Sequence, residues 1–147
     1  MLANLPRATF CAGYLTLSEH SFQRNSKASK HDSRGSLIKL YAQDPAIHFE
    51  LWLHRSRGRA ELGLHFETSD TARNRCLLEY VTDDLLFLKE ALGHGLEAEP
   101  WDKGWTRLYI SYPLERLSSD EQTQLAAAFA AFIETLEPIR RDAIEAC

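Results

Sequence analysis

Two alternating stretches of sequence, separated by a short polar turn, constrain the fold of this chain more than any other feature. In residues 47–54 (IHFELWLH) and 61–67 (ELGLHFE), apolar and polar side chains alternate along the chain. This alternation is typical of β-strands that bury one face and leave the other face polar. Arg57 and Gly58 lie between the two stretches and suit a tight turn. We therefore predict an antiparallel hairpin.

A two-residue turn at Arg57 and Gly58 would also set the register of this hairpin. Its inner face would pair apolar residues, namely Leu53 with Leu62, Leu51 with Leu64 and Phe49 with Phe66. Its outer face would pair His54 with Glu61, Glu50 with His65 and His48 with Glu67, and would place Trp52 over Gly63. A slip of one residue would put apolar side chains opposite polar ones, so we expect the sequence to specify this register strongly.

After the hairpin, the apolar spacing changes to that of amphipathic helices. Between a cap at Ser69 or Asp70 and a stop at Gly93, aliphatic residues recur every three or four positions, at Leu77, Val81, Leu85, Leu88 and Leu92. Short strands at 96–99 and 105–112 follow, and a capping box at 118–121 opens a second helix, which Pro138 should stop or kink. The order ββαββα predicts an α+β fold, with an antiparallel sheet of about four strands and two helices packed on one face.

The N-terminal quarter of the chain differs in composition from the rest. Residues 18–36 are polar, serine-rich and mildly basic, and they include a single aromatic side chain. So little apolar surface does not offset the entropy lost when such a stretch is ordered. We therefore expect residues 1–36 to form an N-terminal segment with a flexible linker, and residues 37–147 to form a single α+β domain.

Composition also indicates the cellular compartment in which the protein is expected. The chain holds no apolar run near the roughly 20 residues that cross a bilayer, and its first residues lack the pattern of a secretory signal. The three cysteines, Cys11, Cys76 and Cys147, are too few and too scattered to suggest a disulfide framework or a CxxC metal site. We expect Cys76 to be a half-buried structural thiol and the protein to be cytoplasmic.

The outer face of the predicted sheet is both acidic and aromatic. It would carry His48, Glu50, Trp52, His54, Glu61, His65, Glu67, Glu97, Glu99, Arg107 and Tyr109, with Trp105 at its edge. Clustered aromatic side chains on a sheet face often mark a contact surface, whereas the excess of glutamates disfavours direct contact with nucleic-acid phosphates. Two plainer explanations stay open: the histidine–glutamate pairs only stabilise the sheet, or residues 1–17 cover the aromatic side chains.

These observations favour a non-enzymatic binding or accessory protein. We predict that it docks a protein partner, or a second copy of itself as a homodimer, with Trp52, Trp105 and Tyr109 as anchors and Arg107 beside them. Aromatic anchors supply most of the binding energy of such interfaces, while the surrounding charges select the partner. On this reading the protein has no cofactor and does not engage a membrane.

Three arginines, Arg55, Arg57 and Arg59, occupy the tip of the predicted hairpin. Their guanidinium groups suit phosphates or carboxylates, so they are candidate contacts to a partner. An exposed, charged turn more often serves only to keep the edge of a sheet soluble.

The alternative function is that of a metal-dependent hydrolase or nuclease. The tripeptide His-Phe-Glu occurs at 48–50 and again at 65–67, and the predicted hairpin brings both copies onto one patch. His48, Glu50, His65 and Glu67 are competent ligands for one divalent transition metal, which could activate a water molecule. The sequence contains no GxSxG, P-loop, GxGxxG or HExxH motif, so we assign no catalytic residue.

Overall fold

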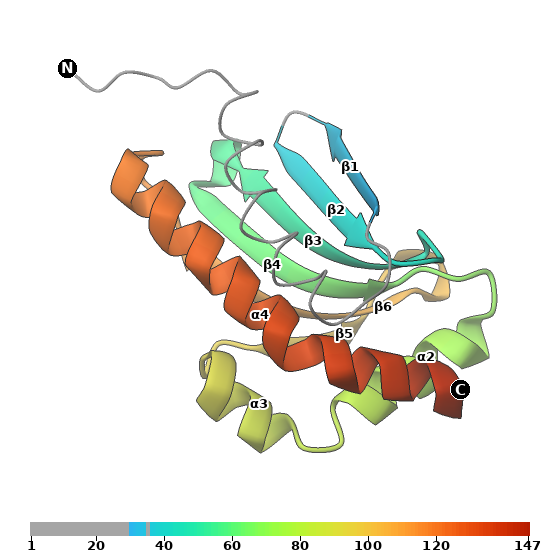
Figure 1. The fold of residues 1–147 in the computed structure, drawn as a ribbon. Helices are drawn as coiled ribbons and strands as arrows, with labels where there is room; N and C mark the ends of the chain where they lie inside the picture. The colour runs from blue at the N-terminus through green and yellow to red at the C-terminus, as the bar shows by residue number, and fades with distance from the viewer. Residues whose placement is uncertain (1–29, 35) are drawn as a thin grey trace.

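A computed structural model describes residues 30–34 and 36–147 (Figure 1). Within this part of the chain, six strands form one sheet in the order β1-β2-β3-β4-β6-β5. The strands are β1 (Lys30–Arg34), β2 (Leu37–Tyr41), β3 (Ile47–His54), β4 (Arg59–Phe66), β5 (Glu97–Pro100) and β6 (Thr106–Pro113). The helices are α2 (Thr71–Val81), α3 (Leu85–Leu92) and α4 (Ser119–Ala146), with 3-10 turns η1 (Arg55–Arg57) and η2 (Asp102–Gly104). None of these helices in the described part is long and apolar enough to cross a membrane.

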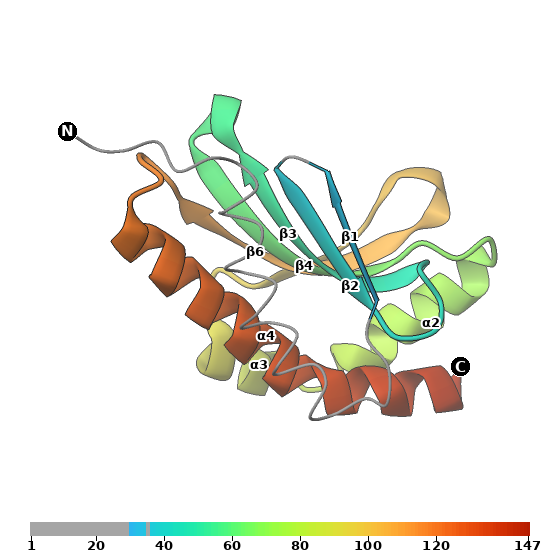
Figure 2. The same cartoon turned by 45° about the horizontal axis from the view of Figure 1, so that its top comes forward.

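The predicted α+β class is confirmed, although the fold has more elements than we predicted. Every strand pair is antiparallel, and the helices form one layer below the sheet in Figure 2. β2 was not predicted, and β1 extends the sheet into the stretch that composition assigned to a linker. Residues 1–29 of the expected N-terminal segment, and with them Cys11, lie outside the described residues.

The predicted register of the β3–β4 hairpin is wrong by two residues. Leu51 lies opposite Leu62 rather than Leu64. The shift arises because the connection contains four residues, the η1 turn and Gly58, rather than two. Gly58 has a φ of 58°, a left-handed conformation that glycine adopts without strain. Since side chains alternate with a period of two, a shift of two residues leaves every side chain on its predicted face.

α4 supplies the main cover of the apolar face of the sheet. It begins at the predicted Ser118 capping box and continues through Pro138 to its C-terminal end, so Pro138 does not stop the helix. Phe132 of α4 packs edge-to-face on Phe49 of β3, with ring centres 6.2 Å apart. Both side chains are fully buried, and burying a side chain of this size contributes about 1.5–3 kcal/mol. This apolar layer is therefore the main source of stability.

The residues predicted as one helix from Asp70 to Leu92 form two helices, and the break has a local cause. The Thr82 hydroxyl donates to the backbone oxygen of Leu78 (2.7 Å) at the end of α2. Asp84 then caps α3, because its carboxylate accepts from the amide of Phe87 (3.1 Å). Such side-chain hydrogen bonds satisfy helix ends locally and so favour stopping one helix and starting another.

A buried asparagine ties α2 to two neighbouring connections. The Asn74 side chain accepts from the amide and hydroxyl of Thr68 (3.0 and 2.6 Å) and donates to the backbone oxygens of Thr68 (3.0 Å) and Gly104 (3.1 Å). The Thr106 hydroxyl donates to the Asn74 backbone oxygen (2.8 Å). These bonds satisfy an amide that is completely buried, so the polar group is accommodated inside the fold at little cost.

A disulfide joins Cys76 in α2 to Cys147 at the end of α4. Cys76 is therefore an exposed half-cystine, and our expectation of a half-buried thiol is wrong. The two cysteines are 71 residues apart in the sequence and meet because α4 packs against α2, a contact that cysteine spacing does not reveal. Stable disulfides are typical of oxidising compartments, so this pair weighs against the cytoplasmic location, which stays a prediction.

We expect the Cys147→Ser variant to lose about 2–4 kcal/mol of free energy of unfolding, because the bridge restricts the unfolded chain. Urea unfolding followed by circular dichroism measures this loss. Adding a reductant should destabilise the wild-type protein by the same amount and leave the variant unchanged. If Cys76 and Cys147 both react with a thiol reagent before reduction, the pairing is contradicted.

Candidate functional site

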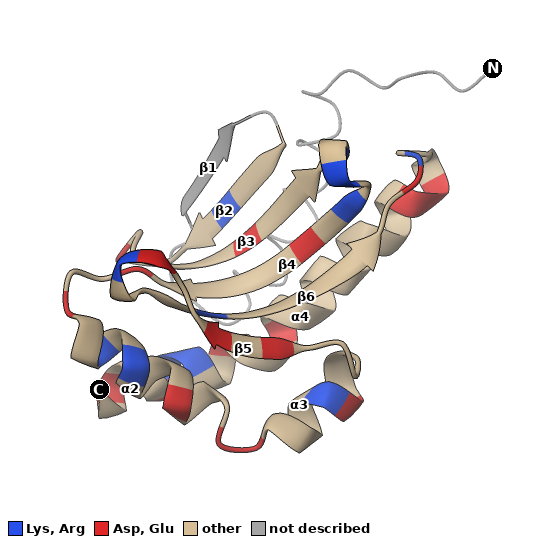
Figure 3. Ribbon diagram, turned by 180° about the vertical axis from the view of Figure 1, so that it is seen from behind, with Lys and Arg blue, Asp and Glu red and all other residues tan. Residues whose placement is uncertain are grey.

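The face of the sheet opposite α4 carries most of the candidate residues. We call it the polar face, and it consists of Lys39, His48, Glu50, Trp52, His54, Glu61, His65, Arg107 and Tyr109, with Glu67 at the end of β4. Figure 3 views the molecule from this side, and no described helix crosses the central strands there. Even so, β3 and β4 are buried along most of their length. Most of the polar side chains therefore pair with one another, whereas His54 Nε2 and Arg59 Nε are buried without a hydrogen-bond partner in the described part of the chain.

Lys39, His48, Glu50, His65 and Glu67 form a histidine–carboxylate cluster across β2, β3 and β4. His48 lies opposite His65, and their rings stack with centres 5.3 Å apart. Each ring approaches a carboxylate on its own strand, His48 Nε2 to Glu50 Oε2 at 3.3 Å and His65 Nδ1 to Glu67 Oε1 at 3.2 Å. Lys39 Nζ lies 3.5 Å from Glu50 and 3.8 Å from Glu67. The five side chains thus form a continuous network of close polar contacts.

The electrostatics of the cluster keep both of its carboxyl groups ionised. Burial alone would raise the pKa of Glu50, but the hydrogen bond with His48 and the positive charges of His65, His48 and Lys39 outweigh burial and lower this pKa. The pKa of Glu67 is lowered in the same way, because its bond with His65 and the charges of His48, Lys39 and His65 outweigh burial. The folded cluster therefore binds protons less readily than the unfolded chain.

The three predicted histidine–glutamate pairs do approach one another, but as diagonal neighbours rather than direct partners. The distances are 3.8 Å for His54–Glu61, 3.9 Å for His65–Glu50 and 4.0 Å for His48–Glu67. A shift of two residues converts each direct pair into a diagonal one, which long side chains can still span.

Trp52 lies opposite Glu61 and not over Gly63, as we predicted. The ring of His65 occupies the space at Gly63 instead. A Cβ atom there would come within 2.6 Å of His65 Nε2, so glycine leaves room for the ring at this position.

Arg107, Glu61, Glu99, Trp101 and Tyr109 form a second group, the arginine–aromatic cluster. The Arg107 guanidinium donates to Glu61 and, through Nε and Nη2, to Glu99 at 2.9 and 2.7 Å. Its central carbon lies 3.6 Å from the ring centre of Trp101 and 3.9 Å from that of Tyr109. Arg107 is only 5% exposed, so it fixes the aromatic rings through charge and stacking rather than projecting from the surface.

The accessible part of this region is aromatic and acidic. Trp101, between β5 and η2, is 36% exposed. Trp101 lies outside any alternating stretch of the sequence, so no pattern assigned it to a face of the sheet. The Tyr109 hydroxyl donates to Glu97 (2.7 Å), and this bond together with burial raises the pKa of Tyr109 to about 12. Tyr109 therefore stays protonated and keeps its place beside Arg107.

The other two predicted anchors are half-buried. The Trp52 ring lies against His54, with ring centres 3.7 Å apart. Lys103 of the η2 turn lies over the Trp105 ring, 5.1 Å from its centre. Both tryptophans are thus held by neighbours while part of each ring stays accessible.

The three arginines at the hairpin tip differ in their exposure to solvent. Arg55 and Arg57 are exposed in the η1 turn. Arg59 is half-buried at the start of β4, where its Nη2 lies 3.7 Å from Glu61. Within the described residues, only Arg55 and Arg57 are fully presented to solvent at the hairpin tip, and Arg59 belongs to the polar face.

Part of the histidine–carboxylate cluster brings together side chains that could hold a metal ion. One ligand atom from each of His48, His65 and Glu67 lies within 4.8 Å of the others. His48 Nδ1 donates to the Pro45 backbone oxygen (2.9 Å), which leaves Nε2 directed at the carboxylates. A ring held in this way through Nδ1 is typical of histidines that bind a metal through Nε2. Glu50, the fourth predicted ligand, lies beside this group and is paired with Lys39.

Comparison with known proteins yields little. No family model and no curated protein matches the sequence. A chain from a solved structure entitled "Structure of the HopA1-SchA Chaperone-Effector Complex" is similar to this chain at 20% sequence identity with a TM-score of 0.42, over 88% of this chain and 97% of that chain.

The lowered pKa values of Glu50 and Glu67 predict an acid-sensitive fold. These carboxyl groups bind protons more weakly in the folded state than in the unfolded state, so their contribution to stability is complete above the ordinary value of 4.5. The contribution is lost as the pH falls through the lowered folded values. We expect the free energy of unfolding to fall steeply as the pH drops below 4.5. The double variant Glu50→Gln/Glu67→Gln should show a shallower dependence of this free energy on pH. Urea unfolding between pH 3 and pH 7 checks this, with the exposed Glu145→Gln as control. Identical slopes for wild type and double variant would contradict it.

Proposed function

We propose that the protein binds another protein through its polar face, with Trp101, Trp52, Trp105 and Tyr109 as aromatic anchors. The observation that carries this proposal is the arrangement around Arg107, where two aromatic rings lie against a guanidinium that is itself held by Glu61 and Glu99. Rings fixed in this way lose little conformational freedom on binding, which favours affinity. Tryptophan and tyrosine are also the residue types that dominate protein interfaces.

Charge supports a protein partner over a nucleic acid. Glu97 and Glu99 lie on the edge strand β5, which ends one residue before the exposed Trp101, and carboxylates repel phosphates. Docking is expected through side chains rather than through an added strand. β5 is only four residues long and ends in Pro100, and a short edge strand with a proline resists pairing with another chain.

The partner is either a different protein or a second copy of this chain. Native mass spectrometry of the untagged protein, isolated from its own cells, distinguishes the two by the mass of the complex. A single chain without a partner under these conditions would contradict the proposal.

We expect Trp101→Ala to weaken the affinity for this partner by at least about tenfold, because truncating an anchor commonly costs more than about 1.4 kcal/mol. Isothermal titration calorimetry with the purified partner measures the change. Glu134→Ala, which truncates an exposed side chain of α4 in the helical layer, is the control and should bind as the wild type does. Wild-type affinity of both Trp101→Ala and Trp52→Ala would refute the assignment of this face.

A second candidate function is a metal-dependent hydrolase or nuclease, which is favoured by the proximity of His48, His65 and Glu67. Two histidines and one glutamate are a ligand set that zinc accepts, with a fourth position left for water. Bound there, the metal would supply an activated water. The chain's own residues would hold the ligands in place, since Pro45 fixes the ring of His48 and Glu50 lies beside the ring of His65.

Metal analysis tests this second candidate. We expect the protein purified without chelator to contain about one zinc, manganese or iron per chain if this function is correct. The double variant His48→Gln/His65→Gln should lose the ion, whereas His94→Gln, which changes an exposed histidine outside the cluster, should retain it. Equal metal content in all three proteins would rule the site out.

A further inference from the structure

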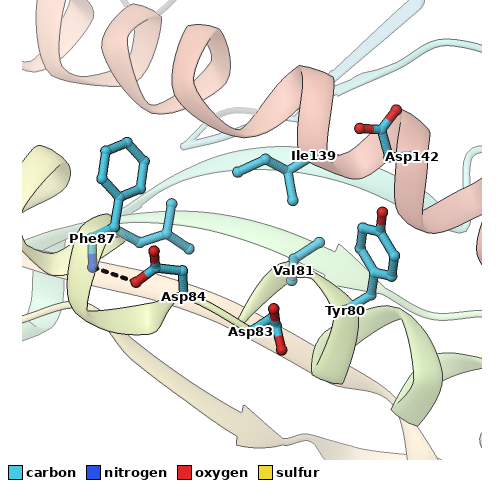
Figure 4. Close-up of a pocket in the computed structure, with 8 residues that line it drawn as sticks. Tyr80, Val81, Asp83, Asp84, Phe87, Ile139 and Asp142 are labelled. Atoms are coloured by element: carbon cyan, nitrogen blue, oxygen red, sulfur yellow. Dashed lines mark hydrogen bonds between the residues drawn. The ribbon is translucent and has the colours of Figure 1, made fainter.

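A groove in the helical layer is not used by the proposed function. It has a volume of about 490 Å³ and lies between α2, α3 and α4. Figure 4 shows Tyr80 and Phe87 extending from α2 and α3 toward α4, from which Ile139 points between them. Val81 and Leu88, both almost fully buried, complete the apolar lining. A groove of this size admits one or two large side chains of a ligand.

The side chains around this groove are unusually exposed for their type. Tyr80 is 42% exposed, Phe87 is 57% exposed, and Leu86, next to Phe87 on α3, is 70% exposed. Apart from Trp101, these are the large apolar side chains that the described residues leave exposed. Adjacent exposed apolar side chains around a groove are typical of an interaction site.

The rim of the groove is acidic. Asp83 and Asp84 lie in the connection between α2 and α3, and Asp142 lies on α4 above Tyr80 in Figure 4. Asp84 is engaged as the cap of α3. Asp83 and Asp142 form no ion pair with any described residue. Three carboxylates around an apolar floor complement a ligand that combines an apolar side chain with positive charge.

The same charges disfavour a second copy of this chain as the occupant. A symmetric dimer would place the same patch on both sides of the interface. Asp83, Asp84 and Asp142 would then face their own counterparts, and like charges close together are repulsive.

We propose that this groove binds a basic amphipathic helix of a partner protein. An apolar side chain of that helix would sit between Tyr80 and Phe87 on the floor formed by Ile139, and flanking lysines or arginines would pair with Asp83 and Asp142. Recognition of this kind places the apolar stripe of a helix in a groove and its basic face on the rim. This surface lies in the helical layer, on the other side of the sheet from the polar face, so it is independent of the proposed function.

The test uses fluorescein-labelled model peptides of about 14 residues, roughly four helical turns. One peptide has leucines on one face of the helix and lysines on the other. In the first control peptide, glutamate replaces every lysine, and in the second, serine replaces every leucine. Fluorescence anisotropy measures the affinity of the full-length protein for each peptide, and amide chemical shifts locate the binding surface.

We expect the lysine–leucine peptide to bind more tightly than either control and to shift amides of α2, α3 and the C-terminal half of α4. Phe87→Ala and Asp142→Asn should each weaken its binding by at least about fivefold. Both residues are exposed, so the variants should fold as the wild type does, and circular dichroism checks this.

Trp101→Ala is the matched control, because it alters the polar face alone, and it should bind the peptide as the wild type does. Three results would overturn the proposal: equal binding of the glutamate–leucine peptide, shifts confined to the polar face, or wild-type affinity of both groove variants. Failure of Trp101→Ala to bind the protein partner, together with normal peptide binding, separates this inference from the proposed function.

Discussion

Pairing of buried charges on the polar face is the constraint on which the centre of the sheet depends. β3 and β4 are buried on both faces, yet only the face toward α4 is apolar. Removing a carboxylate such as Glu50 or Glu61 from water is unfavourable unless an opposite charge compensates for it. Lys39 and Arg107 provide that charge from the neighbouring strands β2 and β6. The β3–β4 hairpin can therefore be buried because β2 and β6 lie on either side of it and supply these charges.

The sequence predicted which side of the sheet each hairpin residue faces, because that information is local. Alternation alone placed Phe49 and Leu51 toward the core and His48 and Glu50 on the other face, and the structure confirms all four. Alternation did not fix which residues of β3 and β4 lie opposite one another, since this register depends on the length of the connection between the two strands. A 3-10 turn followed by a left-handed glycine uses four residues where a tighter turn would use two. The histidines and glutamates nevertheless met, because their long side chains tolerate the shift.

The features that the sequence did not predict depend on contacts between distant parts of the chain or on a single local bond. Trp101 becomes part of the candidate site only because the chain turns after β5 and places its ring on Arg107 of β6. The division between α2 and α3 depends on hydrogen bonds made by the side chains of Thr82 and Asp84, which the spacing of the aliphatic residues did not reveal. Asn74 has no signature at all in the sequence, although it holds two connections together.

The disulfide also has a mechanical consequence for the helical layer. Cys76 lies one helical turn before Tyr80 on α2, and Cys147 closes the same helix that carries Ile139 and Asp142. The disulfide therefore joins α2 and α4, two of the helices that line the groove. The disulfide limits how far α2 and α4 can separate, so it restricts the opening of the groove between them. Reduction of this disulfide would allow α2 and α4 to move apart more freely.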